Sequence, residues 1–350
     1  MAKQRVALLF GGKSGEHEVS VVSAQGVLGA IDTARYEPVP FAITKAGAWL
    51  TPGESREALR ALTPGRYLEV PALSETVLLR RPEVLEALSE VEVAFPLMHG
   101  PYGEDGSIQG LLEVTGVPYV GAGVAASAIG LDKQLQKAIW RQAGLPVVPH
   151  LTVTRREWSD GPDKVQSRIE SCLGYPSFAK PSNGGSSVGI TKLRSREDLG
   201  DAMAAALAYD RKALVEKAMP AHEIECAVLG NEDPQASPLG EVIPHREFYD
   251  YEAKYLDDGT EYAIPPRIPV EHHDAIREMA IAAYKAIGCE GMARVDFFVD
   301  DENAIYLNEI NTIPGFTPIS MYPKLWEAAG LSYTDLISRL VELALERRGA

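Results

Sequence analysis

An alternation of short apolar runs with helical patterns, in the first third of the chain, restricts the fold more than any other feature. Residues 6–10 read Val-Ala-Leu-Leu-Phe and end at Gly11-Gly12, as expected for a buried parallel strand followed by a glycine turn. A helical pattern follows at 18–31, and strand-like runs recur at 39–44, 91–96 and 119–120. This βαβ alternation predicts an open α/β domain with a parallel sheet over residues 1–122.

The rest of the sequence predicts two α+β units, a central one at residues 123–215 and a C-terminal one at 216–350. In the central unit we expect helices at 132–143, 163–172 and 196–208, with strands at 150–154, 177–180, 189–192 and 213–217. In the C-terminal unit we expect strands at 223–229, 239–243, 291–299 and 304–310, with helices at 271–287, 320–329 and 333–347. The polar, tyrosine-rich stretch 248–262 is too long for a plain connector and predicts a functional loop.

Charge and cysteine content exclude several classes of protein. The net charge is −15 without a lysine or arginine cluster, so neither nucleic acid nor an anionic membrane is expected as a partner. No apolar run approaches the ~18 residues of a membrane span, and the first run is too short for a secretion signal, so we expect a cytoplasmic protein. Cys172, Cys226 and Cys289 lie in apolar runs without CxxC spacing, which predicts three buried free thiols.

The first glycine turn approaches two nucleotide-binding motifs without completing either. Gly12-Lys13-Ser14 resembles the end of a P-loop, but the first glycine of that motif would fall at Ala7. A GxGxxG fingerprint closed by Gly12 and Gly15 would begin at Phe10, which excludes a nicotinamide dehydrogenase of that type. The turn is then either purely structural or a ligand site at the start of the next helix.

Two strand-like segments near the C-terminus predict a metal site. They are residues 293–299 and 305–311, joined by the polar turn 300–303. Residues two apart on a strand share a face, so pairing of the segments would bring Asp296, Glu309 and Asn311 together, with Arg294 beside them. Two carboxylates and an amide suit Mg²⁺. The alternative is a solvated polar face on an amphipathic hairpin.

A glycine- and serine-rich loop follows a strand that ends in Lys180. Residues 181–189 read Pro-Ser-Asn-Gly-Gly-Ser-Ser-Val-Gly, which can offer backbone N–H groups and hydroxyls to phosphates and can close over a nucleotide. Lys180 can reach the same phosphates as a point charge. The alternative is a flexible hairpin loop. Glu216, Lys217 and Glu223 can contact adenine or ribose, although side chains at such positions are usually solvated surface.

Distinctive motifs occur along nearly the whole chain. They are Gly11-Gly12-Lys13-Ser14-Gly15-Glu16-His17-Glu18-Val19-Ser20, His99-Gly100 with residues 103–110, Leu131-Asp132-Lys133, Lys180-Pro181 with residues 185–189, residues 248–255, Arg294-Val295-Asp296, and residues 308–312 with Pro314-Gly315-Phe316. These motifs resemble those of the D-alanine–D-alanine ligase family of ATP-grasp enzymes and occur in that family's order. The resemblance implies the ATP-grasp fold, with ATP held between the central and C-terminal units.

The same resemblance implies the chemistry. ATP phosphorylates the carboxylate of one D-alanine, the amine of a second attacks the acyl phosphate, and a tetrahedral intermediate collapses to dipeptide, ADP and phosphate for peptidoglycan synthesis. Two Mg²⁺ or Mn²⁺ ions on Asp296, Glu309 and Asn311 would neutralise the phosphates. The partners expected are ATP and D-alanine, and the chain is expected to form a homodimer.

Individual roles also follow from the resemblance. Catalytic roles are implied for Glu16, Ser186, Tyr255, Arg294, Gly315 and Ser320. D-alanine contacts are implied for Glu16, His99, Arg294, Gly315, Ser320 and the backbone of Met321. ATP contacts are implied for Lys133, Lys180, Ser186, Ser187, Glu216, Lys217, Met219, Glu223, Phe248, Lys254, Asn308 and Glu309.

Two rival functions are weaker. An ester-forming ligase that uses D-lactate belongs to the same fold, but such members tend to change the loop tyrosine, which is present here as Tyr255. A nucleotide-binding protein without turnover would have lost catalytic groups, and all of those implied by the resemblance are present.

Overall fold

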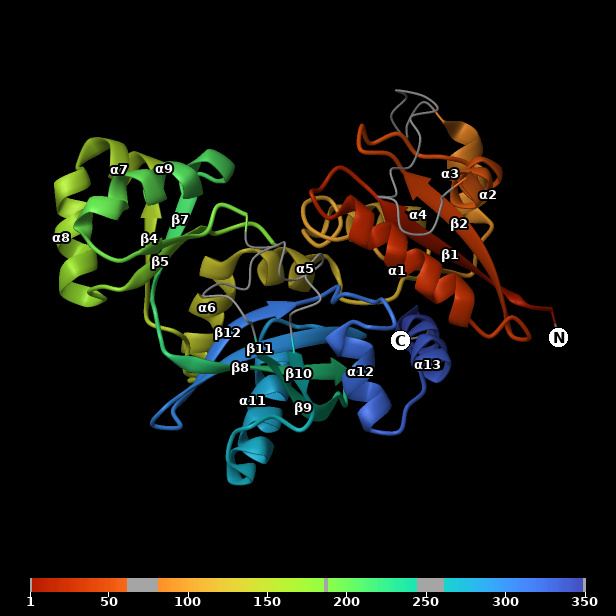
Figure 1. Ribbon diagram of the computed structural model, residues 1–350. Helices are drawn as coiled ribbons and strands as arrows, with labels where there is room; N and C mark the ends of the chain where they lie inside the picture. The colour runs from red at the N-terminus through yellow and green to blue at the C-terminus, as the bar shows by residue number, and fades with distance from the viewer. Residues whose placement is uncertain (1, 62–80, 186–187, 244–260, 349–350) are drawn as a thin grey trace.

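The computed structural model describes residues 2–61, 81–185, 188–243 and 261–348 and contains three sheets (Figure 1). Each sheet belongs to one of the three units expected from the sequence. The predicted loop 248–262 lies outside the described residues except for its last two positions, as do Ser186, Ser187 and Tyr255. The boundaries at residues 122 and 215 stay predictions.

The N-terminal sheet is parallel, as predicted, with strand order β2-β1-β3. Its strands are β1 (Gln4–Gly11), β2 (Tyr36–Ile43) and β3 (Val93–Pro96), and its helices are α1 (His17–Ala30), α2 (Pro52–Ala61), α3 (Pro82–Ser89) and α4 (Ser107–Thr115). The middle strand β1 is covered on both faces, which explains its unbroken apolar run. The strand expected at 119–120 is only a single parallel bridge between Tyr119 and Ala94, because the chain turns away at Gly121.

The central unit is a four-stranded antiparallel sheet with helices and a core of its own. Its strands are β4 (His150–Thr154), β5 (Ser177–Pro181), β6 (Thr191–Leu193) and β7 (Lys212–Lys217), in the order β4-β7-β5-β6. Its helices are α7 (Arg155–Asp160), α8 (Pro162–Cys172) and α9 (Leu199–Tyr209). The apolar cluster beneath these helices contains only residues 151–215, so this unit packs largely on itself (Figure 1, upper left).

The C-terminal sheet has five antiparallel strands in the order β10-β9-β8-β11-β12. They are β8 (Ala221–Leu229), β9 (Gln235–Ile243), β10 (Glu261–Ala263), β11 (Met292–Asp300) and β12 (Ile305–Asn311). The helices around it are α5 (Val124–Leu131), α6 (Lys133–Gln142), α11 (His273–Ala286), α12 (Met321–Ala328) and α13 (Tyr333–Arg348). Trp140 of α6 is fully buried and donates from Nε1 to the Ala283 carbonyl of α11 at 3.0 Å, so α6 packs with this sheet.

The N-terminal sheet and the C-terminal unit share one hydrophobic core. Leu8 of β1 and Phe95 of β3 belong to the same buried cluster as Tyr322 of α12 and Leu340 of α13. Phe316 joins the two sides, with its ring edge-on to Phe95 at 5.3 Å between centroids. These two parts are therefore held together by apolar packing.

The thiols are only partly as predicted. Cys226 and Cys289 are buried and free, but Cys172 is exposed, so that expectation is wrong. Cys172 is the last residue of α8, which buries Val165 and Ile169 and turns its C-terminal end to solvent. No helix in the described part of the chain is long and apolar enough to span a membrane.

Candidate active site

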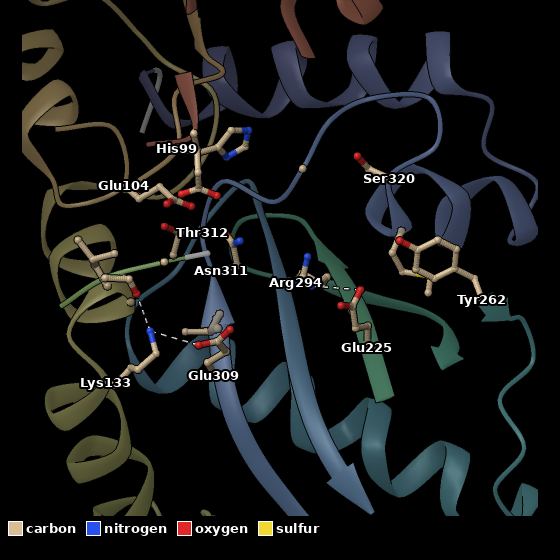
Figure 2. A pocket seen from close by; sticks show the side chains of 18 residues that line it. His99, Glu104, Lys133, Glu225, Tyr262, Arg294, Glu309, Asn311, Thr312 and Ser320 are labelled. Atoms are coloured by element: carbon tan, nitrogen blue, oxygen red, sulfur yellow. Dashed lines mark hydrogen bonds and ion pairs between the residues drawn. The ribbon is translucent and has the colours of Figure 1, made fainter. Parts of the chain in front are cut away.

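A polar pocket lies where the N-terminal loops, the glycine-rich loop and one face of the C-terminal sheet meet (Figure 2). The residues lining it include Glu16, His99, Glu104, Lys133, Gly184, Gly185, Glu225, Tyr262, Arg294, Glu309, Asn311, Thr312, Gly315, Ser320 and Met321. The first part of the chain thus supplies Glu16 and His99, and the last part supplies Arg294, Glu309 and Ser320. All of these were expected from the sequence, whereas Glu104, Glu225 and Tyr262 were not.

The predicted pairing of the two acidic strands is confirmed. β11 and β12 are antiparallel, with Asp296 opposite Glu309 and Arg294 opposite Asn311. A β-bulge follows, because Phe297 pairs with Leu307 and leaves Asn308 as an extra residue. The bulge lets Leu307 point into the core while Glu309 faces the pocket. Residues two apart would otherwise share a face.

Arg294 is held between two carboxylates. Its Nε and Nη2 donate to the two oxygens of Asp296 at 2.7 Å. Nε also lies 3.2 Å from a Glu225 oxygen, as Figure 2 shows. Burial lowers the pKa of Arg294, but the charges of Asp296 and Glu225 outweigh burial and hold that pKa well above its ordinary value. The guanidinium is therefore a fixed cation in the pocket. Glu225 could have been found from its position two residues after Glu223 on the same strand.

Lys133 connects the glycine-rich loop to the acidic strands. Its Nζ donates to the Gly184 carbonyl at 2.7 Å and lies 3.3 Å from a Glu309 oxygen (Figure 2). Asp132, just before it, is the N-cap of α6 and accepts from the Gln134 and Leu135 amides. The cap fixes the start of the helix and so directs Lys133 at the pocket.

A second charged group lies between the central and C-terminal sheets. Glu216 contacts Lys180 and also Lys137, which sequence reasoning missed. Burial opposes ionisation of Glu216, but the two ammonium groups lower the pKa of its carboxyl to about 2. A lysine within an amphipathic helix, such as Lys137 of α6, carries no local signal that distinguishes a buried charge from a surface one.

The N-terminal loops contribute two buried acids and a histidine. The Gly100 amide donates to Glu104 at 2.5 Å, and burial, together with the nearby charge of Glu16, raises the pKa of Glu104 well above its usual range. His99 is also buried, with Nδ1 at 3.1 Å from the Ile313 carbonyl, and burial lowers its pKa. His99 is therefore neutral near pH 7, with Nδ1–H donating to that carbonyl.

The loop before α12 forms the far wall of the pocket. Ser320 is the N-cap residue of α12, and its Oγ accepts from the Thr317 amide at 3.1 Å. A Cβ on Gly315 would come within 3.0 Å of that Oγ, so the close approach favours glycine there. The arrangement leaves the start of α12, with Met321, open to the pocket.

Several predicted ligand residues lie elsewhere. Lys217 ends β7, Met219 follows it and Glu223 lies on β8, outside the polar pocket. Asp296 lies behind Arg294 rather than in the lining, and Asn308 is the bulge residue. Ser186, Ser187, Phe248, Lys254 and Tyr255 lie outside the described residues. The roles implied for all of these residues stay predictions.

Solved structures of similar fold define the class. The chain superposes with a TM-score of 0.81 on a D-alanine-D-alanine ligase from Coxiella burnetii, at 35% identity over 99% of this chain and 96% of that one. It matches the VanG D-Ala:D-Ser ligase from Enterococcus faecalis with the same TM-score, at 32% identity over 98% of this chain and 100% of that one. The predicted ATP-grasp fold, with its open parallel N-terminal domain, is confirmed.

Sequence relatives narrow the class to one family. Models of the D-ala D-ala ligase N-terminus and C-terminus match residues 5–122 and 139–342. A D-alanine–D-alanine ligase of Chloroherpeton thalassium is 50% identical over 99% of this chain and 98% of its own length. D-alanine–D-alanine ligase A of Escherichia coli is 47% identical, covering 100% and 98%. The chain belongs to the D-alanine–D-alanine ligase family.

Proposed function

We propose that this chain joins two D-alanine molecules to D-alanyl-D-alanine with ATP, releasing ADP and phosphate, in the synthesis of peptidoglycan precursors. The observation that carries the proposal is the convergence of Arg294, Glu309 and Asn311 with Gly315 and Ser320 around one pocket. A carboxylate is a poor acyl donor, and the phosphate of D-alanyl phosphate is a good leaving group. The pocket supplies cations and oxygen ligands for that transfer.

The residues divide between the two D-alanines. Glu16 binds the ammonium of the first, with His99 nearby. Arg294 and the Gly315 N–H stabilise the oxyanion of the tetrahedral intermediate, where one oriented donor is worth ~3–4 kcal/mol. Ser320 and the Met321 backbone receive the carboxylate of the second D-alanine, in keeping with their place at the start of α12.

Metal ions fit the donor set on the paired strands. Asp296, Glu309 and Asn311 offer two carboxylates and an amide oxygen at neighbouring positions, the oxygen ligands that Mg²⁺ uses. Both Asp296 oxygens accept from Arg294 in this structure, so Asp296 would share its oxygens between Arg294 and the metal. Two Mg²⁺ or Mn²⁺ ions held here would neutralise phosphate charge during transfer.

The nucleotide lies between the central and C-terminal units. Lys133 and Lys180 contact its phosphates, together with Ser186 and Ser187. Its other contacts are Glu216, Lys217, Met219, Glu223, Phe248, Lys254, Asn308 and Glu309. This activity requires the cytoplasm, which supplies ATP, and we propose a homodimer, a state that sedimentation would test.

The acceptor is a second D-alanine rather than D-lactate. From the family resemblance we expect the Tyr255 hydroxyl to join Ser186 and Glu16 in a network that accepts an ammonium group, which an alcohol lacks. Leaving polar groups unpaired costs about 1–3 kcal/mol per group. A D-Ala:D-Ser ligase shares the fold, so D-serine belongs in the same test.

The decisive experiment measures phosphate release from ATP with D-alanine, L-alanine, D-serine and D-lactate, alone and in pairs, with product analysis from pH 6 to 9. We expect release that requires D-alanine and a dipeptide as the main product. Tyr255→Phe should raise the share of ester without loss of ATP use. Predominant ester or D-alanyl-D-serine from the unaltered chain would overturn the substrate assignment, and absence of D-alanine-dependent release would overturn the activity.

A further inference from the structure

Three charged side chains are buried together between the central sheet and the C-terminal unit. Lys137 comes from α6, Lys180 from β5 and Glu216 from β7. Their side chains are 0%, 9% and 6% exposed, respectively. Burial of so many charges is costly unless each is paired, so the pairing pattern carries information about function.

Each oxygen of Glu216 has its own ammonium partner. Lys137 Nζ lies 2.8 Å from Oε1, and Lys180 Nζ contacts Oε2. Lys137 also donates to the Asn308 carbonyl at 2.6 Å. Asn308 is the bulge residue directly before Glu309, so Lys137 connects α6, the central sheet and the acidic strand β12.

Lys180 cannot serve Glu216 and a phosphate equally well at the same time. The inference rests on the proposed function, in which Lys180 binds nucleotide phosphate. If Lys180 were the sole partner of Glu216, its transfer to phosphate would leave a buried carboxylate uncompensated. With Lys137 present, the group has two cations and one anion, and one positive charge is available to the nucleotide.

We propose that Lys137 is a positioning residue for the nucleotide: it keeps Glu216 neutralised and so frees Lys180 to pair with phosphate. The charge states of the two lysines agree with a transfer of Lys180 from Glu216 to phosphate. Burial lowers the pKa of Lys137 to about 8 against the opposing charge of Glu216, which leaves Lys137 protonated at neutral pH. Burial also disfavours the charged form of Lys180, but Glu216 and Glu309 outweigh it and raise that pKa.

A purely structural role for Lys137 makes a different prediction. If Lys137 only stabilised the local structure, its loss would weaken the binding of the whole nucleotide, including the adenosine moiety. The exchange model predicts an effect on the phosphate contribution alone. The two roles can be distinguished by the ratio of the adenosine dissociation constant to the MgADP dissociation constant. A change in the adenine site affects both constants equally and so leaves this ratio unchanged.

The experiment measures this ratio by calorimetry, with adenosine competed against MgADP. Lys137→Met keeps most of the length of the side chain and removes its charge, so Glu216 retains Lys180. We expect the ratio to fall roughly tenfold, the size of one charge-assisted contact. The control is Lys285→Met, since Lys285 is an exposed residue in the last turn of α11, outside this group and outside the pocket lining. Its ratio should be unchanged.

Removal of Glu216 should reverse the defect. In Lys137→Met with Glu216→Gln no carboxylate retains Lys180, so the ratio should return to within about threefold of that of the unaltered chain. Glu216→Gln alone should keep or raise the ratio. Equal weakening of adenosine and MgADP in Lys137→Met, no recovery in the double variant, or a fall in Glu216→Gln would overturn the proposal. An unaltered chain that binds no MgADP would instead contradict the proposed function.

Discussion

The two interfaces that the C-terminal unit makes are opposite in character. Toward the N-terminal sheet it shares one hydrophobic cluster, which includes Leu8, Phe316 and Leu340. Toward the central sheet it makes polar contacts: Lys137 with Glu216, Lys133 with Gly184 and Lys212 with Asp132. The central unit keeps a separate apolar cluster of its own.

Because one interface is apolar and the other polar, we expect the two to have different roles. Apolar packing is non-directional and proportional to buried area, so it fixes the N-terminal loops against the C-terminal sheet and brings His99 close to Ile313. Ion pairs and hydrogen bonds can exchange partners at little net cost, so the polar interface can accept a charged ligand. Substitutions at the polar interface should therefore change binding and turnover, and substitutions at the apolar interface should change stability.

The largest expected effect is on turnover at the polar interface. Glu309→Gln removes one of the carboxylates proposed to bind metal while keeping the shape of the side chain. We expect turnover to fall at least a hundredfold at ordinary Mg²⁺, since one electrostatic contact to the transition state is worth ~3–4 kcal/mol. The free energy of unfolding should change by less than about 1 kcal/mol, because Glu309 pairs with Lys133 in a partly exposed position.

The control for this variant lies at the apolar interface. Glu290 pairs with Arg347 at 3.4 Å, away from the pocket. Glu290→Gln should leave turnover and its Mg²⁺ dependence unchanged. Near-normal turnover of Glu309→Gln across a Mg²⁺ titration would remove Glu309 from the metal site.

The next effect is on stability and compares the two apolar clusters. Leu340 of α13 and Ile169 of α8 are both fully buried. Each substitution to alanine should lower the free energy of unfolding by about 2–5 kcal/mol through lost contacts and a cavity. Leu340→Ala should reduce amide-exchange protection in β1, β3 and α12, whereas Ile169→Ala should reduce it only in the central sheet.

Loss of protection across all three sheets in both variants would contradict this division. It would mean that the central unit unfolds together with the rest despite its separate core. Comparable protection losses confined to each cluster would support the division and explain how the polar interface can change without unfolding the protein.

The periodicity of the sequence predicted more of the fold than of the candidate active site. The apolar run of β1 and the alternation in β11 and β12 predicted the right sheets, because burial of one or both faces leaves a direct pattern in the sequence. The approach of Glu16 to Arg294 was given only by the family resemblance, since it depends on packing between distant units. The bulge at Asn308 left no pattern, so the contact that it offers to Lys137 could not be predicted.

Two predictions from the sequence were wrong, and both concern residues at the ends of helices or strands. Residues 119–120 have strand-like composition, but Gly121 turns the chain after a single bridge. Cys172 was expected in an apolar run, but Glu170 and Ser171 directly precede it, and it is exposed in the last turn of α8. Local composition does not determine which side of a helix end is covered, and the tertiary contacts of α8 do.

The smallest expected effect is a pH dependence confined to the polar interface. Burial lowers the folded-state pKa of Lys137 from its ordinary 10.5 to about 8. Below pH 8 the lysine is protonated in both the folded and unfolded chains, and the cost of burying its charge is fully present. Between pH 8 and 10.5 only the unfolded chain keeps the proton, so the free energy of unfolding should rise with pH through this window and level off above it.

The test compares the unaltered chain with Lys137→Met by chemical denaturation from pH 7 to 10.5, because groups that titrate identically in both cancel in the difference. Glu216, with a pKa of about 2, stays ionised throughout the window, and Lys180, whose pKa is raised, keeps its proton through most of it. The difference in unfolding free energy should move in favour of the unaltered chain by at most about 2 kcal/mol between pH 8 and 9.5. The difference in unfolding free energy between the unaltered chain and Leu340→Ala should not change with pH, since this substitution removes no charge. A flat difference for Lys137→Met would mean that Lys137 keeps its ordinary pKa because Glu216 fully offsets its burial, and a difference that moves the other way would mean that Glu216 raises that pKa; either result contradicts the prediction.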